Sequence, residues 1–345
     1  MKNKELKAKF VTGTGYDPWF NLALEEYLLH YLKKNEIILY LWQNDNTVVI
    51  GRNQNAWQEC RIGDLEAKKG KLARRLSGGG AVFHDLGNLN YTILMPRQRY
   101  NLKEQLKVIL TALQNLGFEA EFSGRNDILC QGKKISGTAY YFGEKTAYIH
   151  GTVLVDSDLA KLVSYLKVSD AKIKSKGIDS VKARVMNLSQ IEPQITIKAV
   201  KESIKNSFAE IYSQSQLLAE TKINNISDKS LKKLYAKYSS WEWRFGKSPD
   251  FDISINHHFD WGGIELKLKL SSGIIEEAVI YSDAMYADLI EKLSKSLLNK
   301  VFELPVIIES LEKIMINYSW PQVKAQTREL IIKEFIAWLR KELKN

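Results

Sequence analysis

A glycine-rich stretch at residues 74–91, RRLSGGGAVFHDLGNLNY, constrains this chain more than any other feature. Glycine has no Cβ, so the run at 78–80 can adopt positive φ and bring backbone N–H groups close to a ligand. Successive N–H groups that face one point form an anion-binding concavity, and Arg74 and Arg75 add planar, permanently charged groups suited to phosphate or carboxylate. The stretch therefore predicts an anion-binding loop, with a glycine-rich hairpin turn and solvated arginines as the alternative.

Hydrophobic periodicity and turn residues predict the regular elements around this loop. Asp17 is typical of an N-cap, with Pro18 at the first helical position. Helices are expected at 17–34, 58–69, 102–116, from 156 or 158 to 166, 195–216, 227–238, 286–299, 304–316 and 321–344. Strands are expected at 37–42 and 47–50, joined as a hairpin, and at 81–83, 89–95, 128–130, 134–142, 146–155, 264–270 and 274–281. Residues 168–185 are polar and lysine-rich, which predicts a long loop.

The length of 345 residues predicts two domains. A tryptophan-containing segment at 239–248 is the expected boundary. The mixture of strands and helices on both sides predicts an α+β fold class. We expect a large domain at 1–244, with mixed or antiparallel sheets flanked by helices, and a small α+β domain at 245–345.

Composition excludes several classes of protein. Hydrophobic residues make up 45% and charged residues 26%, as in an ordinary globular protein. No apolar run approaches the roughly 20 residues of a membrane helix, and no signal peptide is visible. Two cysteines, Cys60 and Cys130, form neither a disulfide framework nor a metal motif, which indicates a reduced, cytoplasmic location. The net charge of +10 fits an acidic protein partner or a phosphate-bearing substrate; the motifs of nucleic-acid binding are missing.

Lys134 is the strongest candidate for chemistry in the residues themselves. It is expected at the start of a strand after a glycine turn, between Asp127 and the pair Ser136-Gly137. A lysine there can present its ammonium to phosphate and carboxylate together, although most lysines are surface residues, as Lys133 beside it is expected to be.

Histidines and a cysteine offer further candidates. His84 and His150 are each either a general base or a structural histidine at the end of a strand. Cys130 is either an acyl-carrying thiol or a small buried side chain. Arg74 is weighed equally as an anion ligand and as a solvent-exposed residue.

Three segments together resemble the lipoate–protein ligase A family. They are the string RRLSGGGAVFHDLGNLNYT from Arg74, the segments GRND and GKKISGTA at 124–127 and 132–139, and HGTVL at 150–154. Their order and spacing match the family, and the resemblance extends to SWEWRFG at 240–246, so it covers essentially the whole chain. It implies a catalytic domain at 1–244 and a C-terminal accessory domain at 245–345.

The resemblance implies an ATP-dependent ligase. The carboxylate of lipoate attacks the α-phosphate of ATP to give lipoyl-AMP and pyrophosphate; a lysine of an acceptor protein then attacks the acyl carbon and AMP leaves. The implied partners are lipoyl domains of 2-oxoacid dehydrogenase E2 subunits or the H protein of glycine cleavage. The implied cofactors are ATP and Mg²⁺.

The resemblance also implies the site residues, with Lys134 catalytic. The residues implied for ATP and AMP are Arg75, Gly80, Ala81, Val82, Phe83, Asn126, Asp127, Lys134, Gly177, Ser180 and Val181. The residues implied for lipoate are Arg75, Ser77, Gly78, Gly79, His84, Lys134, Tyr140 and His150. Asp127 is the candidate ligand of Mg²⁺, and it or Asn126 would orient Lys134. Trp42, Val49, Phe83 and Tyr140 are candidates for the apolar groove that lipoate needs.

Three alternatives stay open. Octanoyl or lipoyl transferases of the same superfamily use no ATP, and some carry the acyl group on cysteine, which directs attention to Cys130. Biotin–protein ligases resemble the chain near Asp127 and Lys134 but have a Gly-Arg-Gly-Arg loop that is missing here. A non-catalytic, lipoylation-related binding protein would show no lipoate-dependent ATP–pyrophosphate exchange.

Overall fold

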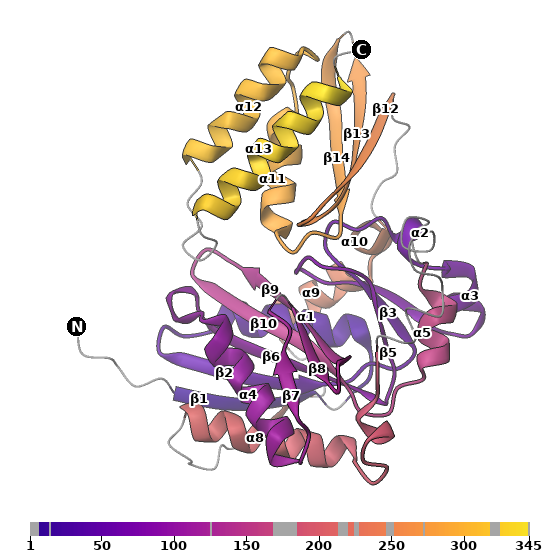
Figure 1. The fold of residues 1–345 in the computed structure, drawn as a ribbon, viewed down its shortest axis with the longest axis vertical. Helices are drawn as coiled ribbons and strands as arrows, with labels where there is room; N and C mark the ends of the chain where they lie inside the picture. The colour runs from indigo at the N-terminus through magenta and orange to yellow at the C-terminus, as the bar shows by residue number, and fades with distance from the viewer. Residues whose placement is uncertain are drawn as a thin grey trace. The chain divides into compact units, whose positions relative to one another are not determined.

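The computed structural model describes residues 7–13, 15–124, 126–167, 185–212, 220–223, 228–245, 252–271, 273–317 and 325–343. The chain forms two compact units (Figure 1). The first comprises Met1–Ile50, Ala56–Arg75 and Ala81–Phe245. The second comprises Gly51–Asn55, Leu76–Gly80 and Gly246–Asn345, so two short loops from the N-terminal half fold with the C-terminal residues.

A mixed eight-stranded sheet organises the first unit. Its order is β11 (Glu220–Ile223), β1 (Lys7–Gly13), β2 (Glu36–Trp42), β6 (Asn88–Pro96), β10 (Thr146–Leu154), β9 (Lys133–Phe142), β8 (Asp127–Cys130) and β7 (Ala120–Phe122). β1 runs parallel to β11 and β2, and the other neighbours are antiparallel. The short strands β1, β7 and β11 were not predicted, because none carries a long apolar alternation.

The two faces of this sheet differ in chemistry. α4 (Leu102–Asn115) and α8 (Ile197–Tyr212) pack together over one face (Figure 1), where alternate strand residues such as Leu39, Ile93 and Ile149 join one hydrophobic core. The intervening residues point to the opposite face. There Tyr40, Thr92 and His150 stand in one cross-strand row, against α1 (Pro18–Tyr31), which packs beside α9 (Lys229–Ser239).

A smaller sheet carries the start of the glycine-rich stretch. β3 (Thr47–Ile50) pairs in parallel with β4 (Lys71–Arg74) and antiparallel with β5 (Val82–His84). The predicted hairpin of 37–42 with 47–50 is therefore wrong, because β2 and β3 lie in different sheets. The connection does not form a tight turn because the Asn44 side chain is buried and hydrogen-bonded to Asn21 and His84.

Short helices surround this sheet. They are α2 (Ala56–Glu59), α3 (Ile62–Ala67), α5 (Leu159–Tyr165) and α10 (Trp241–Phe245), with 3₁₀ turns elsewhere at Arg97–Arg99 and Leu188–Gln190. The predicted helix at 58–69 is broken, because Cys60 forms a β-bridge with Leu166 and the Arg61 N–H donates to Tyr165. Asp158 is confirmed as an N-cap, accepting from two backbone N–H groups of α5.

The second unit packs three helices on a three-stranded antiparallel sheet. β12 (Ile253–Phe259), which was not predicted, precedes the predicted hairpin of β13 (Gly262–Ser271) and β14 (Ile274–Ser282). The helices are α11 (Ala287–Leu297), α12 (Leu304–Asn317) and α13 (Ala325–Glu342). The predicted α+β class is confirmed. Among the described residues, no helix has both the length and the apolar character to cross a membrane.

Candidate active site

Lys134 lies on a tight hairpin beside an acidic partner. Gln131 and Gly132 both have positive φ, 51° and 73°, the pattern of a type I′ turn that joins β8 directly to β9. The hairpin places Lys134 Nζ 2.7 Å from Asp127 Oδ1. Both side chains are about one-third exposed, at 34% and 30%, so the ammonium is oriented and still accessible.

Gly137 leaves room for the lysine side chain. A Cβ on this residue would lie 3.0 Å from both Cε and Nζ of Lys134. The Gly137 N–H donates to the hydroxyl of Thr152 on the adjacent strand β10, at 3.3 Å. The lysine is therefore held between Asp127 on one side and the backbone of its own strand on the other.

Arg74 and Arg75 follow β4 but have different environments. The Arg74 guanidinium donates to the carbonyls of Trp243 and Arg244, each at 2.8 Å, and the Trp243 indole N–H donates back to the Arg74 carbonyl at 2.9 Å. Arg74 is thus buried against α10, not solvent-exposed. Arg75 is buried too, and donates to Val49 O at 3.1 Å. Burial lowers the pKa of Arg75 to about 10, so it stays a cation at neutral pH.

Two of the three glycines serve close packing inside the second unit. A Cβ on Gly78 would lie 2.3 Å from the Ala284 carbonyl oxygen. Gly79 has a φ of 87° and donates its N–H to the same carbonyl at 3.2 Å. Gly80, by contrast, has open space around the position of a Cβ. The sequence analysis assigned all three glycines to a ligand. The packing of Gly78 and Gly79 against the Ala284 carbonyl could not be predicted from it.

The α1-facing side of the large sheet holds a buried polar cluster. Glu25 of α1 is 1% exposed, and its Oε1 lies 2.9 Å from His150 Nδ1 and accepts from the Thr92 hydroxyl at 2.7 Å. Thr92 in turn accepts from the Trp42 indole at 3.0 Å. The sequence analysis missed Glu25, which lies 125 positions from His150 in the chain.

His84 ends β5 and is 3% exposed. Its Nδ1 lies 3.1 Å from Asn44 Nδ2. Burial, together with the charges of Arg75 and His150, lowers the pKa of His84 to about 3, so the ring is neutral at physiological pH. The same electrostatic contacts show that Arg75, His84 and His150 share one region of the first unit.

The apolar candidates divide by burial. Trp42, Val49 and Phe83 are buried in the first unit, whereas Tyr140 is half-buried and meets Tyr100 edge-on at 6.1 Å. Cys130 is 2% exposed in β8, and burial raises the pKa of its thiol. A buried thiol that resists ionisation is a poor acyl carrier.

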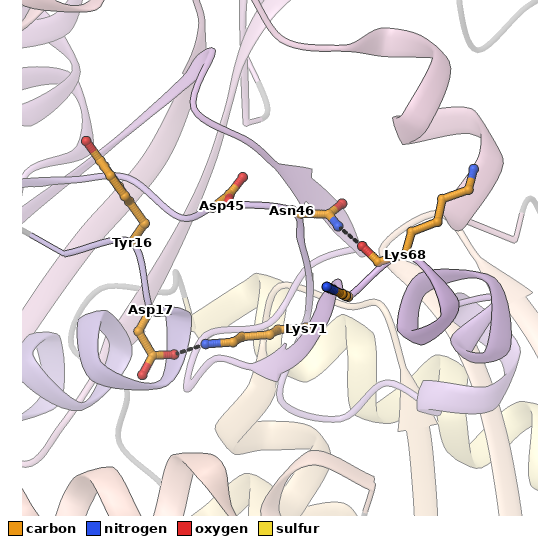
Figure 2. A pocket seen from close by; sticks show the side chains of 7 residues that line it. Tyr16, Asp17, Asp45, Asn46, Lys68 and Lys71 are labelled. Atoms are coloured by element: carbon orange, nitrogen blue, oxygen red, sulfur yellow. Dashed lines mark hydrogen bonds and ion pairs between the residues drawn. The ribbon is translucent and has the colours of Figure 1, made fainter.

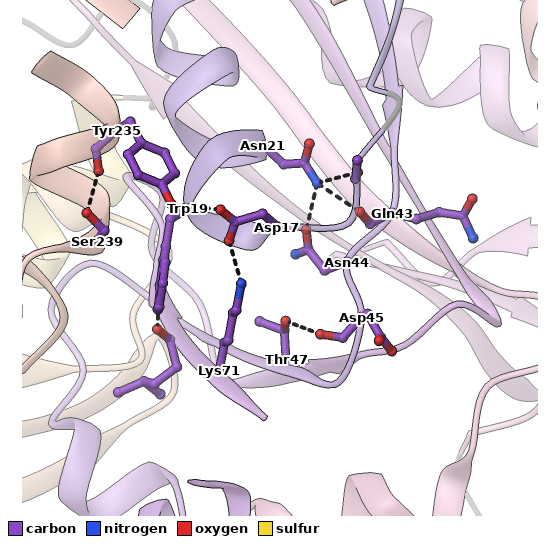
Figure 3. Close-up of polar contacts among 12 residues, drawn as sticks. Asp17, Trp19, Asn21, Gln43, Asn44, Asp45, Thr47, Lys71, Tyr235 and Ser239 are labelled. Carbon is purple, nitrogen blue, oxygen red and sulfur yellow. Dashed lines mark hydrogen bonds and ion pairs between the residues drawn. The ribbon is translucent and has the colours of Figure 1, made fainter. Parts of the chain in front are cut away.

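A separate polar depression of about 340 Å³ lies at the other end of β4 (Figure 2). It is lined by Tyr16, Asp17, Asp45, Asn46, Lys68, Lys69 and Lys71. Asp17 is the N-cap residue of α1 with Pro18 after it, as predicted, but its side chain makes no capping hydrogen bond. It pairs instead with Lys71 at 3.0 Å and accepts from the Tyr235 hydroxyl at 3.0 Å (Figure 3). None of the predicted site residues lines this depression.

Comparison with known proteins decides the family. Residues 17–209 match the lipoyl protein ligase A/B catalytic domain, and residues 248–339 match the C-terminus of bacterial lipoate protein ligases. The chain belongs to the lipoate–protein ligase A family. Membership makes it an enzyme of the ligase class, which confirms the predicted function.

Relatives of this family cover the whole chain. A lipoate–protein ligase A of Psychrobacter cryohalolentis is 38% identical over 99% of this chain and 100% of its own. That of Blochmanniella floridana is 39% identical over 96% of this chain and 97% of its own.

Solved structures show the same fold. P. falciparum LipL1, in complex with lipoate, is 29% identical, with a TM-score of 0.83, over 97% of this chain and 100% of that one. A lipoate–protein ligase A bound with ATP is 25% identical, with a TM-score of 0.59, over 70% and 99%. A bipartite lipoate protein ligase of Thermoplasma acidophilum, described with its E2 lipoyl domain, is 25% identical, with a TM-score of 0.61, over 72% and 100%.

The predicted ligase residues fall into three groups. Lys134, Asp127 and Asn126 lie at the β8–β9 hairpin, and the Asn126 carbonyl accepts the N–H of Thr138 at 2.7 Å. Arg75, His84 and His150 belong to the first unit, where Glu25 lies against His150, while Ser77 and the three glycines belong to the second unit. Gly177, Ser180 and Val181 lie outside the described residues.

Proposed function

We propose that the chain is an ATP-dependent ligase that converts lipoate to lipoyl-AMP and transfers the lipoyl group to a lysine of a lipoyl domain. The observation that carries this proposal is the oriented, accessible ammonium of Lys134 beside Asp127. The reaction needs a positive charge where a carboxylate meets an α-phosphate, because both reactants are anions. Related ligases form complexes with lipoate and with ATP, and one is described with its E2 lipoyl domain; these relatives support the choice of substrates.

Residue roles follow from this proposal. Lys134 neutralises charge on the carboxylate and the α-phosphate as their bond forms and pyrophosphate leaves. Arg75, with a charge that persists at neutral pH, adds a second cation. Backbone groups at Gly80, Ala81, Val82 and Phe83 are assigned to AMP, as are Asn126, Gly177, Ser180 and Val181. Ser77, Gly78, Gly79, His84, Tyr140 and His150 are assigned to lipoate.

Magnesium is proposed to arrive with ATP. Asp127 offers one carboxylate, and the described residues contain no group of three or more carboxylate, histidine or cysteine ligands. Mg²⁺ is commonly held by one or two carboxylates with water and substrate phosphates, so a single Asp127 fits that role. The ion would supply charge neutralisation on the phosphates.

The decisive experiment is lipoate-dependent exchange of pyrophosphate into ATP, followed by transfer to a purified lipoyl domain. Exchange that requires lipoate, and AMP release that requires the acceptor, would support the ligase. Acyl transfer from a carrier protein without ATP would instead identify a transferase, an outcome that the buried Cys130 thiol argues against.

Gly137→Ala is expected to slow pyrophosphate exchange about tenfold, because the new Cβ displaces the Lys134 ammonium from its position beside Asp127. Gly63→Ala is a matched control, since nothing lies within 4 Å of its Cβ position. Thermal unfolding of both variants separates misplacement of the lysine from loss of the fold. Equal exchange rates in the two variants would show that the lysine position does not depend on Gly137.

The acceptor is expected to dock on the first unit through charge. Residues 1–245 contain 37 Lys and Arg against 25 Asp and Glu, a balance of +12, whereas residues 246–345 contain 13 against 15. Attraction between a basic enzyme and an acidic acceptor raises the association rate and is screened by salt. Transfer from preformed lipoyl-AMP should therefore slow as ionic strength rises, while release to hydroxylamine, a neutral nucleophile, should not. A flat profile for the protein acceptor would contradict charge-guided docking.

A further inference from the structure

His84, which is assigned to lipoate, has one buried ring nitrogen whose chemical role is not yet specified. His84 Nε2 is buried, and no atom of the described structure forms a hydrogen bond with it. A buried polar atom without a partner is costly, so such an atom inside a binding site points to a ligand or an ordered water. Whether this nitrogen donates or accepts depends on which ring nitrogen carries the proton.

A chain of buried side chains determines that tautomer. Asn21 Nδ2 lies 2.8 Å from the backbone carbonyl of Gln43, which can only accept, so this atom of Asn21 is the amide nitrogen. Its oxygen accepts from the Tyr40 hydroxyl at 3.1 Å. The orientation of the Asn21 amide is therefore unambiguous.

The orientation of the Asn44 amide follows from that of Asn21. Asn21 Nδ2 also lies 3.0 Å from Asn44 (Figure 3), and only the amide oxygen of Asn44 can accept there. The amide nitrogen of Asn44 then faces His84 Nδ1 at 3.1 Å. Because an amide nitrogen only donates, Nδ1 must be the acceptor, and the proton of the neutral ring lies on Nε2.

We infer that Tyr40, Asn21 and Asn44 form a positioning relay that holds His84 as a neutral N–H donor toward the bound acid substrate. This inference rests on the proposed ligase function for the identity of the substrate, but the tautomer does not. The relay excludes His84 as the general base that its place in the sequence suggested, since Nε2 already carries a proton. The acid substrate thus receives an uncharged donor from His84, beside the cationic guanidinium of Arg75.

The charged and titratable groups that face His84 support a neutral ring. Arg75 and His150 both disfavour a proton on it, and burial acts in the same direction. The carboxylate of Glu25 is paired with His150, because Glu25 Oε1 lies 2.9 Å from His150 Nδ1.

The tautomer can be measured directly in the wild-type protein. The chain has five histidines, so imidazole ¹⁵N spectra are simple, and the His84 signal is assigned by its loss in His84→Gln. We expect a protonated Nε2 and a bare Nδ1, with no titration between pH 5 and 8. A protonated Nδ1, or a titration in that range, would overturn the inference whatever the enzyme acts on.

Asn44→Asp reverses the last link of the relay. A carboxylate can still accept from Asn21, but it can only accept from His84, so it draws the ring proton to Nδ1 and leaves Nε2 bare. The KM for lipoate should rise about 10- to 100-fold, while the KM for ATP should hardly change. The added negative charge raises the pKa of His84, and the doubly protonated ring regains Nε2–H. The deficit should therefore shrink as the pH falls.

Asn46→Asp is the matched control, because it makes the same change two residues away, where the side-chain amide donates to Lys68 O at 2.8 Å and has no bond to a histidine among the described residues. It should leave the His84 spectrum and the KM for lipoate unchanged. An Asn44→Asp protein with the wild-type tautomer would refute the relay. The shifted tautomer with an unchanged KM for lipoate would refute the donor role. If Asn44→Asp does not fold, the wild-type spectrum still decides the tautomer.

Discussion

Replacing Lys134 with alanine is expected to slow lipoate-dependent pyrophosphate exchange by about 30- to 1,000-fold. The change removes a cation that stabilises charge at the carboxylate and α-phosphate, and the loss of such a contact costs about 2–4 kcal/mol in the transition state. The fold should survive, since one-third of the Lys134 side chain is exposed and its ion pair is with the part-exposed Asp127.

Two neighbouring variants are matched controls for Lys134→Ala. Lys133→Ala changes an exposed lysine on the same strand and should keep near wild-type exchange. Cys130→Ser should also be nearly silent, because the thiol is buried in β8 and the mechanism has no thioester. AMP release that persists in Lys134→Ala, or a hydroxylamine-sensitive acyl group on Cys130, would refute the mechanism.

The elements that the sequence predicted well are those whose partners are close in the chain. The β13–β14 hairpin turns at Gly273 with a φ of 76°, and α4 ends before Gly117 with a φ of 86°; both depend on glycine at a local turn. The partners of β2 and β3 are not local. β2 pairs with β1 and β6, and β3 lies in another sheet. The turn residues at 43–46 therefore could not show that the two strands do not pair.

The same distinction applies to the candidate site. Lys134 and Asp127 are seven positions apart across one hairpin, so their proximity follows from a local turn. Glu25 meets His150 across 125 positions, and Asn44 meets His84 across 40. Neither pairing has a signal in a single sequence, because each depends on the packing of elements that are distant in the chain. Glu25 and Asn44 were therefore missed.

Glu25→Ala is expected to cost about 2–6 kcal/mol of unfolding free energy, because two buried groups each lose an acceptor at about 1–3 kcal/mol. The alanine leaves the Thr92 hydroxyl and His150 Nδ1 without their acceptor, at 2.7 and 2.9 Å in the wild type. For a protein of this size the melting temperature should fall on the order of 10 °C. Calorimetry and urea unfolding measure both quantities.

Glu26→Ala tests whether the burial of the partner side chains causes the effect. Glu26 is the next residue of α1 and pairs with Lys237 at 2.7 Å, but Lys237 is 32% exposed and can turn to water when its partner is lost. That change should cost only about 1 kcal/mol. Glu25→Gln should lie between the two, because its amide oxygen can still accept from Thr92 and His150. Equal losses at Glu25 and Glu26 would mean that the buried cluster stabilises the first unit no more than an ion pair with a part-exposed lysine does.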